Sequence, residues 1–394
     1  MNGTIYMPVG EVCSSISDTY REKKNMVTLI NTSDVLEGRV LNHERVPNSN
    51  LKGQFKKTFQ RDDILYSEIR PQNRRFAYVD FSPIDYIAST KLMVIRAKKD
   101  VVSPKYLYYF LKNSSTVAEL QLLAETRSGT FPQITFSEVA NLTIPVPSLA
   151  VQEVIVQTMQ CLEDKITCNE QINDNLEQQA QAIYHERFET VSPNDLPSDW
   201  RIVTLGEVAT NSNKSFNPLK EPEILLEHYS IPAFDEARFP VFELSTSIKS
   251  NKFIIDASCF MISKLNPTTK RVWKPYCLTG NAVCSTEFIV YKAKDQSITD
   301  FLYSVIDSGS FSDFMCSHVT GSTGSRQRTT PSDTLSYELI LPSEDELAEF
   351  QSLVSPMYAQ MRINAIENDK LKRLRDSLLP KLMSGEIDVS AVQL

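Results

Sequence analysis

The sequence predicts an α+β chain made of two tandem modules, each a globular domain followed by a long helix. Three observations lead to this prediction: an internal repeat, a helical run over residues 151–188, and a second run over 350–378 with the same spacing of apolar and amide residues. Neither Pro nor Gly interrupts the first run, which permits one continuous helix. We expect the two long helices to pack against each other as a coiled coil.

The repeat extends over most of the chain. Early matches are 196 positions apart, as in Gly10-Glu11-Val12 and Gly206-Glu207-Val208, and after one net deletion matches are 195 apart, as in Gly129 and Gly324. Further matches, in the same order, join Ser67, Pro71 and Arg75 to Ser263, Pro267 and Arg271. This period is far longer than that of a solenoid repeat. The repeat therefore indicates duplication of a whole module.

Each globular domain mixes strands with short helices. Apolar, β-branched and aromatic segments predict strands, and amphipathic segments predict short helices. The predicted strands are 76–79, 92–95, 288–291 and 337–340, and the predicted helices are 104–112 and 298–307. Ser343 with Glu346 predicts a capping box at the start of the second long helix, Ser148 alone is expected to cap the first, and Gly385 predicts where the second ends.

These signals predict the domain limits. A polar linker with two prolines, Pro193 and Pro197, separates the modules. The predicted segments are domain 1 at 1–149, the first long helix at 150–189, the linker at 190–198, domain 2 at 199–343, the second long helix at 344–384 and a tail at 385–394.

The seam of each long helix carries two asparagines. Steps of four and three residues along 155–183 place Asn169 and Asn173 on the first seam, and the same steps place Asn364 and Asn368 on the second. A buried Asn costs stability but fixes register, because only one alignment lets the amides pair. We therefore expect these four residues to set the register of the coiled coil. The alternative is two separate core helices, each packed on its own domain.

Composition is that of an ordinary soluble chain. Of 394 residues 41% are hydrophobic and 23% charged, and no apolar stretch approaches the roughly 18 residues that a membrane span needs. The N-terminus lacks a signal-peptide pattern, and seven cysteines without a CxxC pair favour reduced thiols. We expect a cytoplasmic protein. The net charge of −8 says little about a binding surface, because acidic residues concentrate on the first long helix.

No catalytic motif is found in the sequence. The Gly-Ser-Thr-Gly-Ser run at 321–325 is not followed by Gly-Lys-Ser/Thr, so it does not match a phosphate-binding P-loop. The Asn-Pro pairs at 217 and 266 lack the second Pro and the aromatic residue of amino-methyltransferases, and none of the four His stands at metal spacing with Cys. We expect no catalytic residue, metal or cofactor on this chain itself.

Basic loops with amide and hydroxyl neighbours occur at matching places in both modules. Arg, Asn and Gln form bidentate bonds to base edges, whereas Lys, Ser and Thr suit phosphate contacts. For any one of these residues a solvated loop is an equally good interpretation, but their paired occurrence favours DNA binding for the set. The DNA-binding candidates are Arg70, Asn73, Arg74, Arg75, Arg127 and Thr130 in the first module, and Lys264, Lys270, Arg271, Ser325, Arg326, Gln327 and Arg328 in the second.

Over essentially its full length the chain resembles a type I restriction–modification specificity subunit. The residues that carry the resemblance are the closing motif Leu378-Leu379-Pro380-Lys381-Leu382-Met383-Ser384-Gly385-Glu386-Ile387, the motif Leu196-Pro197-x-x-Trp200 before Leu205-Gly206-Glu207-Val208, and Gly129-Thr130-x-Pro132-Gln133-Ile134. Two departures stand out. The first domain has no match for Trp200, and Arg326-Gln327-Arg328-Thr329 replaces the Phe-Pro-Gln-Ile version.

The resemblance implies a targeting subunit and not a catalyst. In this family each domain is a target-recognition domain with a curved, mainly antiparallel sheet that reads one half of a split site in double-stranded DNA. The long helices form an antiparallel coiled coil that sets the gap between the half-sites, and they dock two methyltransferase subunits. S-adenosylmethionine belongs to those subunits, while ATP and Mg belong to restriction subunits where the system has them.

Two other functions remain open from the residues themselves. The chain could be a coiled-coil adaptor that joins proteins without reading DNA, which neutral effects of Arg75→Ala and Arg271→Ala on site preference would favour. It could also be a self-contained methyltransferase or nuclease, which the missing motifs disfavour and which methylation by the purified chain alone would support.

Overall fold

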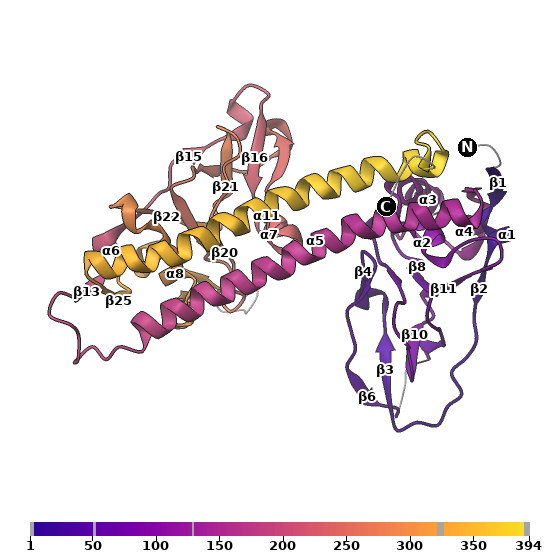
Figure 1. Cartoon of the computed structure of the whole chain (residues 1–394), viewed down its shortest axis with the longest axis horizontal. Coiled ribbons are helices and arrows are strands. Elements are labelled where there is room, and N and C mark those ends of the chain that lie inside the picture. Colours follow the sequence, from indigo (N-terminus) through magenta and orange to yellow (C-terminus); the bar gives the residue numbers. More distant parts are fainter. Residues whose placement is uncertain (1–3, 50–52, 128–129, 321–326, 390–394) are drawn as a thin grey trace. The chain divides into compact units, whose positions relative to one another are not determined.

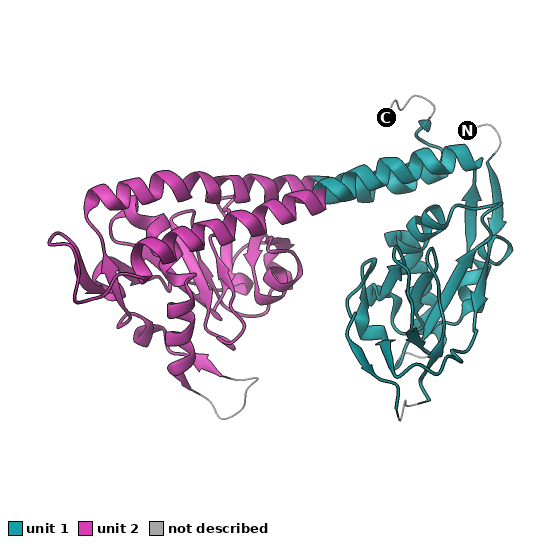
Figure 2. Ribbon diagram, turned by 60° about the horizontal axis from the view of Figure 1, so that its bottom comes forward, with its two compact units in different colours: residues 1–165, 371–394 teal, residues 166–370 magenta. Residues whose placement is uncertain are grey.

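The computed structural model describes residues 4–49, 53–127, 130–320 and 327–389. They form two compact units: unit 1 is Met1–Lys165 with Leu371–Leu394, and unit 2 is Ile166–Lys370 (Figure 2). Each unit holds one globular domain and a part of both long helices. We call the globular parts domain 1 and domain 2. The limits expected from the sequence stay a prediction.

Domain 1 is built on two four-stranded sheets (Figure 1). One has the order β2-β11-β8-β9 and is antiparallel throughout, and the other has the order β6-β3-β10-β7, in which only β3 and β10 run parallel. Two-stranded pairs join β1 to β12 and β4 to β5. The strands are β1 (Ile5–Pro8), β2 (Cys13–Ile16), β3 (Met26–Ile30), β4 (Val35–Leu36), β5 (Arg39–Val40), β6 (Arg45–Pro47), β7 (Phe55–Lys57), β8 (Ile64–Ser67), β9 (Phe76–Tyr78), β10 (Tyr86–Ser89), β11 (Leu92–Ala97) and β12 (Thr143–Val146).

The described residues of domain 1 also form six short helices, of which α1, α2, α3 and α4 share one core with the first of these sheets. They are α1 (Val9–Val12), η1 (Thr32–Asp34), η2 (Pro71–Asn73), α2 (Pro104–Lys112), α3 (Ser114–Arg127) and α4 (Phe136–Asn141). The apolar face of α2 buries Tyr106, Leu107 and Leu111 in one core with Ile64 and Ile95 from the sheet. The predicted helix 104–112 and the predicted strands at 76–79 and 92–95 are confirmed.

Domain 2 repeats this topology. Its sheet β14-β22-β19-β20 corresponds to β2-β11-β8-β9, and β17-β16-β21-β18 corresponds to β6-β3-β10-β7 with β15 added at the edge. Again a single pair of this second sheet, β16 with β21, runs parallel. The strands are β13 (Arg201–Thr204), β14 (Ala209–Asn211), β15 (Ser215–Phe216), β16 (Leu225–Tyr229), β17 (Val241–Leu244), β18 (Lys252–Ile254), β19 (Cys259–Ser263), β20 (Val272–Trp273), β21 (Ala282–Ser285), β22 (Phe288–Ala293), β23 (Val319–Thr320), β24 (Arg328–Thr329) and β25 (Glu338–Leu341).

The two domains differ most where domain 1 has the β4–β5 hairpin, because domain 2 has the helix α7 there instead. Its helices are α6 (Leu205–Val208), η4 (Pro218–Lys220), α7 (Ile231–Ala237), η5 (Ser245–Ser247), η6 (Gln296–Ile298), α8 (Thr299–Ile306), α9 (Gly309–Ser317) and α10 (Pro331–Thr334). The predicted helix at 298–307 corresponds to α8, the predicted strand at 288–291 lies within β22, and the predicted strand at 337–340 corresponds to β25 with an offset of one residue.

The long helices are α5 (Leu149–Tyr184) and α11 (Glu344–Ser384). A π-helical segment, η3 (His185–Glu189), follows α5. Ser148 Oγ accepts from the main-chain N–H of Val151, as expected of a lone cap. Gly385 has φ +79°, which confirms the predicted left-handed end of α11.

The capping box expected at the start of α11 is only half formed. Ser343 Oγ accepts from the main-chain N–H of Glu346, but the Glu346 carboxylate is used elsewhere, 3.3 Å from Arg187 Nη1. The guanidinium of Arg187 is a stronger partner for a carboxylate than one main-chain N–H. Among the described helices, none is long and apolar enough to cross a membrane.

The long helices run antiparallel within each unit. In unit 2 Asn169 bonds to Asn368, and Asn173, further along α5, bonds to the earlier residue Asn364 of α11. In unit 1 the packing of Ile155 and Met159 beside Leu379 and Leu382 belongs to one apolar core. The predicted coiled-coil pairing is confirmed.

Candidate nucleic-acid interface

In domain 1 two of the predicted basic loops lie side by side. The loop around η2 meets residues 130–134: the main-chain N–H of Arg70 donates to Pro132 O at 3.1 Å, and that of Ile134 donates to Glu68 O at 2.9 Å. Ile69 and Gln133 form an isolated antiparallel bridge between them. The contact brings the predicted residues Arg70, Asn73 and Thr130 into one region, because each lies on or beside these paired segments.

Domain 2 repeats this arrangement bond for bond. The N–H of Asn266 donates to Gln327 O at 3.0 Å, that of Thr329 donates to Lys264 O at 3.2 Å, and Leu265 bridges Arg328. The structure therefore brings the predicted residues Lys264, Gln327 and Arg328 together. Ser325 and Arg326 lie outside the described residues, so their prediction stays as it was. We call these two arrangements the paired loops.

The backbone enters both paired loops in a left-handed conformation. Arg70 has φ +44° and its repeat counterpart Asn266 has φ +47°. Such a conformation costs a non-glycine residue on the order of 1 kcal/mol or more and persists where the surroundings hold it. Because it recurs at equivalent positions with different side chains, the shape of the loop, and not the side chain, is what both domains retain.

Several predicted arginines of domain 1 contact other protein groups. Arg74 donates to Ser114 Oγ at 2.8 Å and pairs with Glu37 at 3.8 Å. Arg75 donates to Ser33 O at 2.9 Å, and Arg127 forms an ion pair with Glu138 at 2.7 Å. Arg70 and Asn73, in contrast, are exposed. These two side chains can contact a ligand without first breaking one of the side-chain hydrogen bonds or ion pairs that the other arginines make.

Three of the predicted cations of domain 2, Lys270, Arg271 and Arg328, are also paired. Arg271 makes a two-pronged ion pair with Asp235 of α7 and its side chain is only 13% exposed. Arg328 donates its Nε to Glu287 at 2.9 Å, and this hydrogen bond raises the pKa of its guanidinium. Lys270 Nζ lies 2.8 Å from the Asp307 carboxylate and donates to Asp307 O at 2.7 Å. DNA phosphates would have to compete with these carboxylates.

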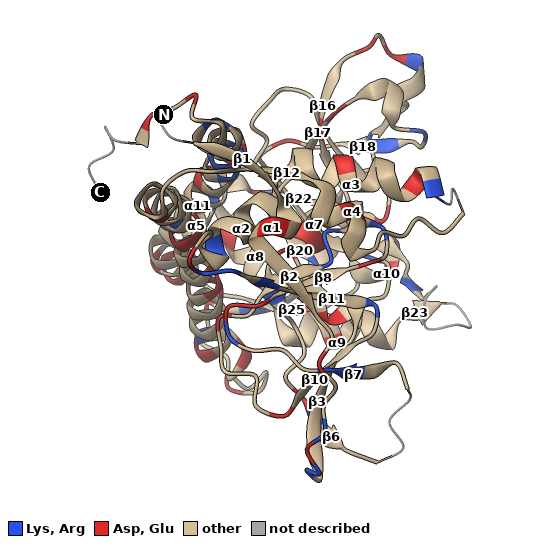
Figure 3. Ribbon diagram, turned by 90° about the vertical axis from the view of Figure 1, so that its right-hand side faces the viewer, with Lys and Arg blue, Asp and Glu red and all other residues tan. Residues whose placement is uncertain are grey.

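Two polar residues at the paired loop of domain 1, Gln133 and Lys91, were absent from the sequence prediction. Gln133 occupies the bridge in domain 1, and Lys91 donates to its Oε1 at 3.2 Å. The repeat could have identified Gln133, because it aligns with Arg328. The prediction also omitted the basic run Arg21-Glu22-Lys23-Lys24 before β3, whose signal is charge alone. All three of its cations are exposed. Figure 3 marks the described Lys and Arg in blue, and they occur on many separate loops, strands and helices.

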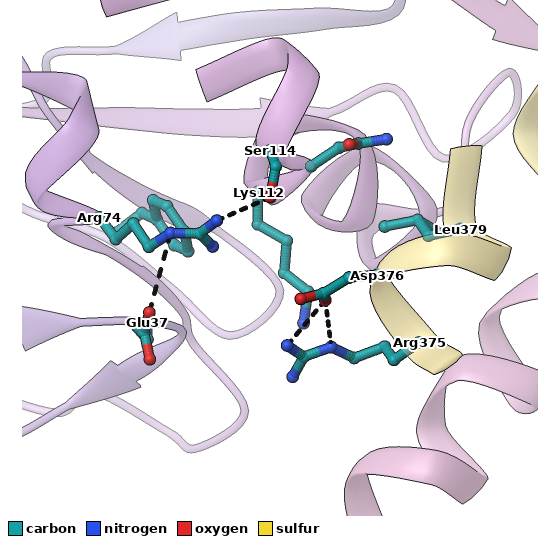
Figure 4. A pocket seen from close by; sticks show the side chains of 9 residues that line it. Glu37, Arg74, Lys112, Ser114, Arg375, Asp376 and Leu379 are labelled. Carbon is teal, nitrogen blue, oxygen red and sulfur yellow. Dashed lines mark hydrogen bonds and ion pairs between the residues drawn. The ribbon is translucent and has the colours of Figure 1, made fainter. Parts of the chain in front are cut away.

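A polar cavity in unit 1 lies beside the η2 loop, between the α2–α3 junction and the last turns of α11 (Figure 4). Its lining residues are Glu37, Arg74, Phe76, Lys112, Asn113, Ser114, Arg375, Asp376 and Leu379. The charges within it are matched: Arg74 pairs with Glu37, and Arg375 donates to Asp376 at 2.8 Å. Lys112 pairs with Glu163 of α5. The cavity is therefore a charge-balanced junction between domain 1 and the helices.

The four predicted seam asparagines are paired across the helices of unit 2. Asn169 Nδ2 donates to Asn368 Oδ1 at 2.9 Å, and Asn364 Nδ2 donates to Asn173 Oδ1 at 2.8 Å. Their role in register stays a prediction. Among the described residues no group of three or more His, Cys, Asp or Glu is placed to hold a metal ion.

Comparison with known proteins agrees with this architecture. Residues 6–178 match the family model of the type I restriction modification DNA specificity domain. The type I restriction enzyme HindI specificity subunit of Haemophilus influenzae is 28% identical to the chain, over 92% of the chain and 94% of that protein. The MjaIX specificity subunit of Methanocaldococcus jannaschii is 25% identical, over 78% of the chain and 76% of that protein.

Two solved structures show the same fold. A type I restriction–modification system S subunit from M. genitalium superposes with a TM-score of 0.53 at 15% identity, over 97% of this chain and 96% of its own. A chain from a type I restriction–modification system superposes with a TM-score of 0.51 at 19% identity, over 98% and 99%. With its two repeated domains and paired long helices, the chain is similar over most of its length to type I restriction–modification specificity subunits, and its residues 6–178 match the DNA specificity domain of that family.

Proposed function

We propose that this chain is the DNA sequence-specificity subunit of a type I restriction–modification complex. Each domain reads one half of a bipartite target in double-stranded DNA through its paired loop, and the two long helices set the gap between the half-sites. As a specificity subunit it recognises DNA and does not catalyse. Because its proposed target is DNA, we place the complex in the cytoplasm.

The observation that carries the proposal is the duplicated paired loop. Equivalent main-chain bonds join Arg70 to Pro132 in domain 1 and Asn266 to Gln327 in domain 2. The same backbone thus presents different side chains in the two domains, which suits a protein that reads two different half-sites. Side-chain contacts to base edges specify sequence, whereas contacts to phosphates fix position.

The partners follow from this role. Two methyltransferase subunits would dock on the surfaces of α5 and α11 and would bind S-adenosylmethionine, and restriction subunits, where the system has them, would bind ATP and Mg. The fixed helix pair should make the gap between half-sites strict, because changing it both displaces and rotates one half-site about the DNA axis.

The test is to co-express the chain with its cognate methyltransferase subunit and to map methylated adenines across the host genome. We expect one split motif with two short specified halves and a constant unspecified gap. Methylation without a split motif, or no methylation by a complex that has assembled, would overturn the proposal.

A matched pair of variants separates DNA contact from folding. Arg70→Ala removes an exposed side chain and should weaken DNA binding with little effect on stability. Arg271→Ala removes the partner of Asp235 and should lower the stability of unit 2. Its effect on DNA therefore cannot be interpreted without an unfolding measurement.

The ion pairs favour a second function, that of a coiled-coil adaptor that does not read DNA. Arg127 and Arg271 both bind carboxylates of the chain itself, which lowers the positive charge available to DNA. An adaptor would assemble with the methyltransferase, but the methylated sites would then share no split motif. The same methylation map therefore decides between the two functions.

A further inference from the structure

The bridge in each paired loop holds one long polar side chain on a fixed backbone. Gln133 and Arg328 occupy equivalent positions, and each is bridged to the opposite segment. Main-chain hydrogen bonds on both sides of the bridge, such as the 2.9 Å bond from Ile134 to Glu68, pin the backbone. A side chain on such a backbone loses little freedom on binding, which is the condition for selective recognition.

A neighbouring side chain orients Gln133 in domain 1. Lys91 Nζ donates to Gln133 Oε1 at 3.2 Å and to Glu68 Oε2 at 3.4 Å. An ammonium group can only donate, so the amide must turn its oxygen toward Lys91. The Nε2 amide group is then the part of Gln133 that can act on another molecule, and it acts as a donor.

Domain 2 has the opposite charge at the orienting position. The repeat aligns Lys91 with Glu287, whose carboxylate accepts from Arg328 Nε at 2.9 Å and from Nη2 at 3.2 Å. A carboxylate only accepts, so it fixes one edge of the guanidinium. The orienting residue thus changes from donor to acceptor when its neighbour changes from amide to guanidinium.

The scaffold beneath these side chains is the same in both domains. Glu68 donates its main-chain N–H to Lys91 O at 3.0 Å, and Lys264 donates to Glu287 O at 2.9 Å. Position 68 also changes sign, from Glu to Lys at 264. The polarity of these side chains is exchanged between the domains, while the main-chain bonds named here are kept. Such a matched change is expected of a side chain that contacts a ligand and a neighbour that orients it.

We propose that Gln133 and Arg328 are specificity-determining residues that each contact a base pair of their domain's half-site, and that Lys91 and Glu287 are the positioning residues that orient them. This inference rests on the proposed function. Gln133, presenting its amide N–H groups, selects a base edge with an acceptor. Arg328 selects guanine, whose O6 and N7 match a guanidinium.

The test replaces both Gln133 and Lys91 of domain 1 with the residues found at the equivalent positions of domain 2. In the chain assembled with its cognate methyltransferase, Lys91→Glu with Gln133→Arg installs in domain 1 the pair found in domain 2. We expect the methylation map to change at one base of one half-site, toward guanine, while the other half-site and the gap stay the same. Gln133→Ala should relax preference at that base by roughly tenfold or more.

Control variants separate orientation from folding. Lys91→Ala should reduce the base preference at the same position as Gln133→Ala, while the unfolding temperature stays close to that of the wild type. A purely structural residue would not give this pattern. Lys99→Ala removes another exposed lysine of domain 1 that pairs with Asp62 at 2.6 Å, and it should leave the motif unchanged.

Three results would be adverse in different ways. A wild-type complex without a split motif would overturn the proposed function, and with it this inference. A split motif that survives Gln133→Ala and the exchange unchanged would overturn this inference alone. If Gln133→Ala instead weakens methylation equally at all sites, Gln133 contacts a phosphate and does not read a base. That result would also overturn this inference.

Discussion

Asn169 of α5 donates its side-chain amide to Asn368 Oδ1 of α11 at 2.9 Å, in the buried seam of the helix pair. One turn further along α5, the Asn173 Oδ1 accepts from Asn364 at 2.8 Å. Asn368 in turn donates to Ile166 O at 3.2 Å. A shift of either helix by one turn would separate these partners and bury their amides against apolar side chains, so we predict that the amides favour a single register.

Replacing one member of the amide pair should therefore cost more than replacing both. Asn169→Leu leaves the buried Oδ1 of Asn368 without this donor, which should lower the free energy of unfolding by about 1–3 kcal/mol. Adding Asn368→Leu removes both polar groups and should recover most of that loss. Urea unfolding of the chain, followed by far-UV circular dichroism, measures both effects.

The control for this pair is Asn175→Leu, an exposed position on the same helix. It should change stability little, because its amide is solvated in both states. A double variant no more stable than Asn169→Leu alone would show that the Asn169–Asn368 bond does not account for the loss.

A second prediction concerns the junction of α2 with the helices of unit 1. Glu163 pairs with Lys112, whose side chain is only 11% exposed, and accepts from Tyr109 Oη at 2.9 Å. Glu163→Gln leaves the buried ammonium without its counter-charge, which should lower the free energy of unfolding by about 1–3 kcal/mol. Denaturant unfolding measures the loss, and Glu153→Gln, exposed on the same helix, should be nearly neutral.

A compensating change tests the cause. Lys112→Met in the Glu163→Gln background removes the uncompensated charge and should restore part of the stability. If Lys112→Met instead destabilises this background further, the uncompensated charge is not the source of the loss. The contact of the Lys112 ammonium with the rings of Tyr108 and Tyr109 would then account for the lysine's contribution.

The sequence predicted those features of the fold that a repeat makes visible. The helix pair follows from matched seams, and the equivalence of Arg70 with Asn266 follows from the matched Ser-Pro-Arg spacing. The repeat does not give the contact partner of Asn169, however. It aligns Asn169 with Asn364, whereas antiparallel packing places Asn169 against Asn368.

Much of the candidate site depends on contacts that local sequence cannot reveal. Asp235, which binds Arg271, is 36 residues away on α7, and nothing in the loop sequence selects that carboxylate. The second sheet of each domain was also not predicted, because strands such as β10 (Tyr86–Ser89) and β21 (Ala282–Ser285) are too short for alternation to stand out. Tertiary pairing decides these features.

A third prediction is a pH dependence from Asp307. Burial raises the pKa of Asp307 to about 6, against the opposite effect of the Lys270 ammonium. That ammonium lies 2.8 Å from Oδ1 but directs its hydrogen bond to Asp307 O, so the carboxylate is paired without being well solvated. Glu177 also faces it and raises its pKa, whereas Arg238 lowers it.

The folded state holds the Asp307 proton more tightly than the unfolded state, so this residue makes the protein less stable as the pH rises. The contribution of Asp307 to stability is fully present below about pH 4 and is lost as the pH rises through about 6. Asp307→Asn should flatten this part of the curve of unfolding temperature against pH. Asp313→Asn, an exposed acid on α9, should leave it unchanged, and an unaltered slope in Asp307→Asn would contradict the assignment.

The turn between β4 and β5 provides the last prediction, because it holds the η2 loop from the other side. Gly38 has φ +106°, and a Cβ built there would lie 2.2 Å from Tyr108 Oη. Its N–H donates to Phe76 O at 2.9 Å, while the neighbouring Glu37 donates to Arg74 O at 3.0 Å. Gly38→Ala should lower the unfolding free energy of unit 1 by about 1–3 kcal/mol through backbone strain and displacement of Tyr108. Gly53→Ala, where a Cβ meets no atom within 4 Å, is the matched control. Equal stability of the two variants in denaturant unfolding would show that the turn can move freely and does not support the loop that carries Arg74.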